Sequence, residues 1–513
     1  MSVIVETALG KLQGIDRNEY VEFRGIPYAQ PPIGENRFKA PQPLEPWEGI
    51  RKADRFSDAA PQDEISLFGI GQTNEDCLYL NIWTPALDDK KRPVMFWVHG
   101  GGYITGAGSQ LIYRGRDLAI NGDVVVVTFN YRLGVLGYLH LADRVDAEFG
   151  ADSNVGMLDQ IAALKWVREN IASMGGDPEQ ITIFGESAGA MACAALIASP
   201  CAKGLFKKAI LQSGSGDHVL TRHDANRITD KFFEAAEISP DNPEKLRQLD
   251  IKTIIKAQRE CLKLSVDRGL HRQAVPQFGM TLVPVIDGDT LPQAPITAIE
   301  DGVAKDIPLL IGSTRDEWNL FLHTPGPQGE SLAKTKYKDL DKHRLIQICE
   351  RDLPSLGEKS ANLYEQLLKQ RNENATYLDM YSAFESDRVF RIPSIRIAEA
   401  QSRHLENVYM FSFEWDKGVF GACHAVDIPF VFGGVSGGVG QILTGGGDAA
   451  KRLSDKVQSC WIAFARSSNP GTDDVGQWPG YDTADRQVMI FDNETRLEKD
   501  PHGDSRQYWE GIL

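Results

Sequence analysis

The chain has 513 residues and a net charge of −16, and its composition is 42% hydrophobic and 25% charged. This composition is ordinary for a globular protein and excludes a disordered or fibrous chain. An acidic surface repels nucleic-acid phosphates and anionic lipids, so we expect neither as a partner. No apolar run approaches the ~20 residues of a membrane span.

The seven cysteines are scattered without a Cys-x-x-Cys pair, which argues against a disulfide scaffold or a metal site and favours buried free thiols. Without a visible secretory signal at the start, we expect a cytoplasmic protein.

Short apolar runs rich in β-branched residues recur along the chain and predict strands. They are apolar on both faces and alternate with helical segments, which indicates an α/β fold: a mostly parallel central sheet with helices on both faces. We expect one domain over residues 1–513, with helical insertions at roughly 216–300 and 324–400. The predicted strand cores are Val94–Val98, Val124–Asn130, Ile181–Phe184, Ala209–Leu211, Leu309–Ile311 and Val408–Phe413.

A glycine-rich loop, His99-Gly-Gly-Gly-Tyr103, follows the first of these strands. Consecutive glycines leave backbone N–H groups unshielded, as the stabilisation of an alkoxide in acyl transfer requires. A flexible glycine loop and a phosphate cradle are the alternatives, but the Lys-Ser/Thr pair of a P-loop does not follow. The loop therefore favours acyl-transfer chemistry.

The clearest helix is predicted at Leu158–Met174, where apolar residues recur at three- and four-residue steps. Gly175–Gly176 should end it, and Asp177–Pro178 should turn the chain into the strand Ile181–Phe184. This arrangement leads directly into a second glycine-rich turn.

That turn is Gly185-Glu-Ser-Ala-Gly189, between an apolar strand and the small-residue helix Ala188–Ala198. A nucleophile elbow needs this context, because the turn is so tight that only small residues fit two before and two after the serine. An ordinary strand–helix turn with a capping serine is the alternative. We identify Ser187 as the candidate nucleophile and the N–H groups of Gly101, Gly102 and Ala188 as the oxyanion donors.

A serine nucleophile needs a histidine base and a carboxylate that orients it, and in folds with a nucleophile elbow the chain order is serine, acid, histidine. Asp316 and Glu317 both follow the strand Leu309–Ile311. Either could be the acid, and either could be a surface charge paired with Arg315. The residues alone do not separate them.

Eight histidines follow Ser187, and His424 is the preferred base. It lies in a loop after the strand Val408–Phe413, and so at the carboxyl edge of the predicted sheet, where catalytic groups gather. His404 lies in a charged helical stretch and is expected on the surface. The glycine-rich stretch Gly433–Gly447 is expected to be a mobile loop near the site.

Motifs along nearly the whole chain resemble those of the type B carboxylesterase family, the cholinesterase-like branch of the α/β-hydrolases. The resemblance is greatest to its bacterial para-nitrobenzyl-esterase-type members. The motifs are FRGIPYAQPP (23–32), EDCLYLN (75–81), HGGGY (99–103), NVGMLDQ (154–160), GESAGA (185–190), QSGS (212–215), DE (316–317) and HAVDIPFVFG (424–433).

This resemblance implies a catalytic triad of Ser187, Glu317 and His424, which resolves the choice between the two acids. It also implies an oxyanion hole of the Gly101, Gly102 and Ala188 N–H groups. Two residues are implied in supporting roles: Glu186, beside the nucleophile, and Ser213, near the acid–histidine pair.

The chain also departs from the family pattern. Cholinesterases carry a choline-binding tryptophan ten residues before the cysteine of the EDCLYLN motif, where this chain has Leu67 followed by Phe68, so we expect no cation–π site for choline. The cysteine that would pair with Cys77 is missing. Trp318 replaces a small residue after the acid, where it either narrows the acyl side of the pocket or is a core aromatic.

The sequence thus predicts a serine carboxylesterase that hydrolyses short- to medium-chain acyl or aryl esters through an acyl-enzyme on Ser187. No cofactor and no metal is required, and the expected partner is a small-molecule ester; we expect a monomer or small homo-oligomer. A non-catalytic binding module is the competing class. Amidase, carbamate hydrolase and lipase activities are alternatives within the enzyme class, and the absence of an evident apolar lid disfavours a lipase.

Overall fold

A computed structural model describes residues 1–63, 69–264, 280–325, 330–371 and 374–512. In these ranges thirteen strands form one mixed sheet, in the order β1-β2-β3-β5-β7-β6-β8-β9-β10-β11-β12-β13, with β4 paired to β2. The strands are β1 (Ser2–Thr7), β2 (Gly10–Asp16), β3 (Val21–Pro27), β4 (Ile50–Lys52), β5 (Tyr79–Thr84), β6 (Arg92–Val98), β7 (Val125–Phe129), β8 (Gly176–Glu186), β9 (Lys208–Gln212), β10 (Leu309–Thr314), β11 (Val408–Phe413), β12 (Gln487–Phe491) and β13 (Arg496–Lys499).

The strands from β7 to β12 along this order pair in parallel. Antiparallel pairs flank this parallel block, with β1, β2, β3 and β5 on one side and β13 on the other. All six strand cores predicted from the sequence lie in the parallel block. The block's strands are almost wholly buried, which is why an apolar run identified them.

The turn predicted at Asp177–Pro178 is wrong, because β8 already begins at Gly176. Arg92 of β6 pairs with Gly176, and the next pair joins Val94 to Ile181, so β8 advances five residues while β6 advances two. The extra residues form a bulge. Pro178 has no N–H for the ladder, and a bulge accommodates it.

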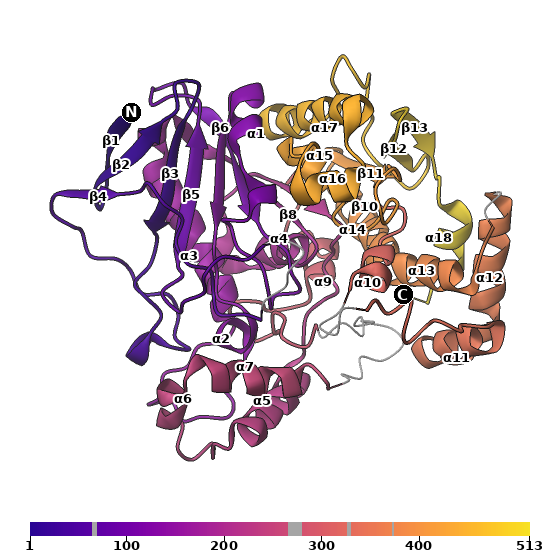
Figure 1. The fold of residues 1–513 in the computed structure, drawn as a ribbon, viewed down its shortest axis with the longest axis horizontal. Coiled ribbons are helices and arrows are strands. Elements are labelled where there is room, and N and C mark those ends of the chain that lie inside the picture. Colours follow the sequence, from indigo (N-terminus) through magenta and orange to yellow (C-terminus); the bar gives the residue numbers. More distant parts are fainter. Residues whose placement is uncertain (64–68, 265–279, 326–329, 372–373, 513) are drawn as a thin grey trace.

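Side chains alternate across the sheet and create two apolar layers. Phe96 joins the cluster that contains Leu164, whereas its neighbour Trp97 joins the other cluster and lies 5.0 Å from the ring of Phe432. In Figure 1, α1, α15, α16 and α17 gather at the top of the view, on the side of the Trp97 layer. The helices of this side are α1 (Arg116–Gly122), α15 (Ile428–Phe432), α16 (Gly438–Thr444) and α17 (Gly447–Ser467).

Helices on the Phe96 side include the one predicted at Leu158–Met174, which the structure places at α3 (Val155–Asn170) with a 3₁₀ turn, Ile171–Met174, at its end. Gly175 follows at φ +79°, the left-handed conformation of a helix end. The other helices that contribute to this layer are α2 (Gly134–Tyr138), α4 (Ala188–Ala198), α9 (Pro295–Glu300) and α14 (Ile392–Ser402).

Helices also occupy the two ranges expected to be insertions. Figure 1 places α5, α6 and α7 at the bottom of the view and α11 and α12 at its right. The last helix of the second range, α14, packs against β10 and β11 and thus belongs to a layer of the sheet. The remaining helices are α5 (Arg222–Ala236), α6 (Glu244–Gln248), α7 (Ile251–Cys261), α10 (Asn319–His323), α11 (Lys342–Asp352), α12 (Gly357–Gln370), α13 (Tyr377–Ser386) and α18 (Gly503–Trp509), with a π-helix at Asp387–Arg391.

Three further expectations concern single segments. The stretch Gly433–Gly447 was expected to be a loop, but its residues Gly438–Thr444 form α16. Cys201 is exposed, so the expectation of buried thiols is wrong for this residue, while the other six cysteines are buried. Among the described residues, no helix has both the length and the apolar character to cross a membrane.

Candidate active site

Ser187 lies between the end of β8 and the start of α4, as a nucleophile elbow requires. Its backbone has φ +57° and ψ −129°, and its N–H donates to the Gln212 carbonyl at 2.9 Å. A Cβ on Gly185 would lie 2.5 Å from the Gly189 backbone, and a Cβ on Gly189 would lie 2.0 Å from the Val98 carbonyl oxygen. Both positions therefore require glycine, and the serine side chain is lifted into a cavity.

Glu317 and His424 meet at the carboxyl edge of the sheet. Glu317 follows β10, His424 lies between β11 and α15, and both side chains are buried. His424 Nδ1 lies 2.6 Å from Glu317 Oε2, and Glu317 Oε1 accepts the Thr314 N–H at 2.7 Å. The acid therefore has both oxygens engaged, and it fixes the ring with its proton on Nδ1.

Asp316, the other candidate acid, points elsewhere. Its carboxylate accepts from the Arg315 guanidinium at 3.0 Å and stays partly exposed. This is the surface pairing considered from the sequence, so of the two candidate acids Glu317 is the one in contact with His424. His404, the histidine expected on the surface, is exposed there.

The other ring nitrogen of His424 faces Glu186. Nε2 lies 3.0 Å from Glu186 Oε1, and both side chains are buried. In the described part of the chain no hydrogen bond joins Ser187 Oγ to His424. The structure therefore places the imidazole between two carboxylates, Glu317 at Nδ1 and Glu186 at Nε2.

This placement changes the acidity of both partners. Burial lowers the pKa of His424, but the charges and hydrogen bonds of Glu186 and Glu317 outweigh burial and raise the pKa to about 10. Burial raises the pKa of Glu186, against the opposing effect of His424. The two carboxylates therefore favour the protonated imidazole, and Nε2 must lose its proton before it can act as a base.

The glycine loop after β6 lines the same cavity through Gly100, Gly101 and Gly102. Gly101 and Gly102 have φ +110° and +62°, and a Cβ on Gly101 would lie 2.2 Å from the Thr105 carbonyl oxygen. Within the described residues, the N–H groups of Gly101 and Gly102 donate to no acceptor. Ala188 is the first residue of α4, so its N–H also lacks a partner inside the helix.

The cavity has a volume of about 460 Å³. Its wall is mainly apolar, and no Lys or Arg lies among the described residues that line it. Trp318 is buried in this wall, so it is both a packed aromatic and a boundary of the pocket. The rings of Phe321 and Phe390 lie 5.1 and 4.7 Å from the His424 ring.

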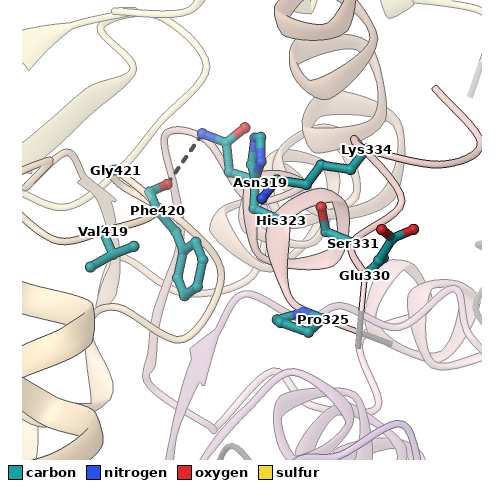
Figure 2. A pocket seen from close by; sticks show the side chains of 9 residues that line it. All are labelled: Asn319, His323, Pro325, Glu330, Ser331, Lys334, Val419, Phe420 and Gly421. Carbon is teal, nitrogen blue, oxygen red and sulfur yellow. Dashed lines mark hydrogen bonds between the residues drawn. The ribbon is translucent and has the colours of Figure 1, made fainter. Parts of the chain in front are cut away.

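A second pocket adjoins this cavity, since Pro325 and Glu330 line both. Its volume is about 580 Å³. Figure 2 shows its lining side chains, with Asn319 and His323 of α10 on one side and residues 419–421 on the other. The Asn319 amide donates to the Phe420 carbonyl at 3.3 Å and ties the two sides together. Ser187 and His424 do not line this pocket.

Ser213 and the stretch Gly433–Gly447 take no part in the described cluster. Ser213 is buried, but its hydroxyl makes no hydrogen bond among the described residues, so the structure does not connect it to Glu317 or His424. No residue of the stretch 433–447 lines the cavity. Leu67 and Phe68, at the position of the choline-binding tryptophan, lie outside the described residues.

Sequence reasoning missed a buried chain of side chains behind His424. Asp427 Oδ2 accepts from the Gln212 amide at 2.8 Å, and Gln212 Oε1 accepts from the Trp461 indole N–H at 3.0 Å. Burial, with Glu186 nearby, raises the pKa of Asp427 to about 7. An aspartate in the otherwise apolar run after His424 was the available signal.

The chain is similar to known proteins along nearly its whole length. Residues 1–509 match the carboxylesterase family. The chain is 39% identical over 511 residues to the para-nitrobenzyl esterase of Bacillus subtilis (strain 168), covering 98% of each chain. It is 32% identical over 506 residues to the phenmedipham hydrolase of Pseudarthrobacter oxydans, covering 96% of this chain and 95% of the relative. The solved carboxylesterase EST55 of Geobacillus stearothermophilus superposes with a TM-score of 0.85 at 36% identity, covering 99% of each chain.

The fold is that of an α/β-hydrolase. The chain belongs to the carboxylesterase family, and it is a serine carboxylesterase that hydrolyses carboxylic esters. The fold, family and activity predicted from the sequence are therefore confirmed, and the competing prediction of a non-catalytic binding module is not.

Proposed function

We propose that Ser187, His424 and Glu317 are the catalytic triad of this esterase and that the N–H groups of Gly101, Gly102 and Ala188 form its oxyanion hole. The observation that carries the proposal is the 2.6 Å contact between Glu317 and His424 Nδ1, beside a serine on a strained turn. With Nδ1–H held by Glu317, loss of the second ring proton leaves a lone pair on Nε2.

In the first half-reaction the Ser187 oxygen bonds to the ester carbonyl carbon while Nε2 of His424 takes the serine proton. The carbonyl π electrons move to oxygen, and the three N–H groups stabilise the resulting alkoxide. When the alkoxide collapses, the C–O bond to the alcohol breaks and His424 returns the proton to the leaving alcohol. Water then repeats these steps on the acyl-enzyme, releases the carboxylic acid and restores Ser187.

The wall of the cavity supports small, uncharged, apolar substrates. Its apolar side chains favour burial of short- to medium-chain acyl or aryl groups. Its charged groups include Glu186 and Glu330, without a compensating Lys or Arg among the described lining residues. An anionic acyl group would therefore be desolvated without a partner, and we propose that anionic esters are poor substrates.

We further propose that the chain functions as one domain over residues 1–513, as a cytoplasmic monomer or small homo-oligomer without a nucleic-acid partner. The net charge of −16 and the unpaired thiols support this assignment. Cell fractionation and light scattering of the purified protein test it.

The triad is tested by covalent labelling. An organophosphate should add one phosphyl group to Ser187, located by peptide mass spectrometry, and the labelled enzyme should lose its esterase activity. Ser187→Ala should resist labelling and lose about 10⁶-fold in kcat. Stoichiometric labelling at another residue, or turnover that survives in Ser187→Ala, would contradict the proposal.

A further inference from the structure

A single buried side chain, Gln62, holds the far end of the glycine loop. Gln62 Oε1 accepts from Thr105 Oγ1 at 2.6 Å and from the Gly106 N–H at 2.8 Å. Its amide nitrogen donates to the Gly106 carbonyl at 2.9 Å and to the Ala60 carbonyl at 3.0 Å. Four hydrogen bonds engage both donors and both acceptor sites of the amide, so the side chain has one defined orientation.

Thr105 connects this clamp to the oxyanion region. The N–H groups of Ile104 and Thr105 donate to the Gly101 carbonyl at 3.1 and 3.0 Å. A trans peptide is planar, so its C=O and N–H point in opposite directions. Fixing the Gly101 carbonyl toward Thr105 therefore turns the Gly102 N–H away from Thr105. Among the described residues that N–H donates to no acceptor, and Gly102 lines the cavity.

Glycine cannot hold such a conformation by itself. It populates positive and negative φ about equally, so Gly101 and Gly102 need external restraint. At the start of the loop, Tyr131 provides it through a 2.8 Å hydrogen bond from its hydroxyl to the His99 carbonyl. At the end of the loop, Gln62 provides it through Thr105 and Gly106.

We propose that Gln62 is a positioning residue for the oxyanion hole, acting through Thr105 and the Gly101 carbonyl to aim the Gly102 N–H at the alkoxide. This inference rests on the proposed function of the glycine loop. Because the alkoxide exists only after the serine has attacked, the loss of Gln62 should weaken binding of the transition state more than binding of the ester.

The test is Gln62→Met, which keeps the length of the side chain and removes its hydrogen bonds. We expect kcat to fall about 10- to 100-fold, less than the 10²–10³-fold loss of a whole oxyanion donor, while KM changes less than about 3-fold. Gln42→Met is the matched control, because Gln42 lies outside the cavity and its amide nitrogen donates to the nearby Ala40 carbonyl. It should leave both constants unchanged.

A second readout separates positioning from general damage. An alkyl trifluoromethyl ketone adds to the serine as a tetrahedral alkoxide, so its affinity should fall in Gln62→Met by the same factor as kcat/KM. The affinity of the corresponding unfluorinated ketone, measured as competitive inhibition, should stay within about 3-fold. Equal losses for both ketones, or a folded Gln62→Met with wild-type kcat, would overturn the proposal.

If Gln62→Met does not fold, two variants of Thr105 test the same proposal. Thr105→Val removes the hydroxyl that donates to Gln62, and Thr105→Ser restores it, so kcat should fall in the first variant and recover in the second. An equal kcat in the two variants would also overturn the proposal. Ser187→Ala distinguishes failure of the triad proposal from failure of the Gln62 proposal. Activity that survives in Ser187→Ala refutes the triad. If Ser187→Ala is inactive and Gln62→Met has wild-type kcat, only the role of Gln62 is refuted.

Discussion

Glu317 and His424 are joined twice, once through their side chains and once through the backbone. Besides the 2.6 Å contact of Nδ1 with Oε2, the His424 N–H donates to the Glu317 carbonyl at 3.2 Å. These two contacts hold together two loops that lie more than 100 residues apart in the sequence. The ring orientation is set by the loop backbone as well as by the carboxylate.

Glu317→Gln is predicted to keep this backbone contact while its amide favours the wrong ring tautomer. We expect kcat to fall about 10⁴-fold with little change in the folded structure, as for the equivalent change in a serine protease triad. Steady-state kinetics with a chromogenic ester measure the loss. Asp316→Asn is the matched control and should cost less than about 10-fold, because a partly exposed ion pair contributes little. A larger loss in Asp316→Asn would reverse the assignment.

The pH dependence of kcat/KM should report the two carboxylates around His424. A base must be neutral, and the raised pKa of His424, about 10, moves the rising limb of the profile above the ordinary value of about 6.5. Glu186→Gln removes one of the two charges that raise this pKa, so its limb should move to lower pH. Glu330→Gln, which lies at the cavity but is not among the charges that raise the pKa, should leave the limb in place. A limb that moves to higher pH in Glu186→Gln would contradict this account.

Asp427 should make stability depend on pH. Burial raises its pKa from 3.8 to about 7, so the folded state binds a proton more strongly than the unfolded state. The free energy of unfolding should therefore fall as the pH rises from 3.8 to about 7, by at most about 1.4 kcal/mol per pH unit. Asp427→Asn removes this contribution. The free energy of unfolding of the variant minus that of the wild type should therefore be larger at pH 8 than at pH 5. Urea unfolding at both pH values measures the difference. If the stability difference between variant and wild type is the same at both pH values, the buried carboxylate is not the cause.

Trp318 should limit the size of the acyl group. Trp318→Phe replaces the indole in the cavity wall by a smaller ring. For two esters of the same alcohol, kcat/KM for the ester with a bulky aromatic acyl group should therefore rise relative to that for the acetate ester, by about 10-fold or less. The control is Trp478→Phe, since Trp478 is equally buried but lies in the other apolar layer. It should lower stability without changing the ratio of the two esters. An unchanged ratio in Trp318→Phe would show that the indole does not bound the acyl group.

The sequence predicted the elements whose signal is local. Strands of the parallel block are apolar on both faces, so runs such as Val408–Phe413 were located to the residue. Edge strands such as β1 expose alternate residues, and their weaker pattern was not singled out. The turn at Asp177–Pro178 failed because a bulge, unlike a loop, leaves the same proline in a strand.

The active-site residues also differ in whether a local sequence pattern identifies them. Ser187 and the glycine loop carry local motifs, whereas the choice between Asp316 and Glu317 needed either a family resemblance or coordinates. The contact of Glu186 with His424 and the clamp by Gln62 join segments that are far apart in the chain. No spacing encodes such contacts, because they depend on how side chains pack after the sheet has formed.

The aromatic wall suggests where new selectivity can be engineered. Trp318 directly precedes α10, Phe321 lies within α10 and Phe390 lies in the π-helix. The elbow and the glycine loop instead extend from strands at the centre of the sheet. Gly185 and Gly189 tolerate no side chain, so mutational libraries aimed there would yield inactive protein. Libraries confined to the three aromatic positions would instead vary enantiomer and acyl preference on an intact catalytic apparatus.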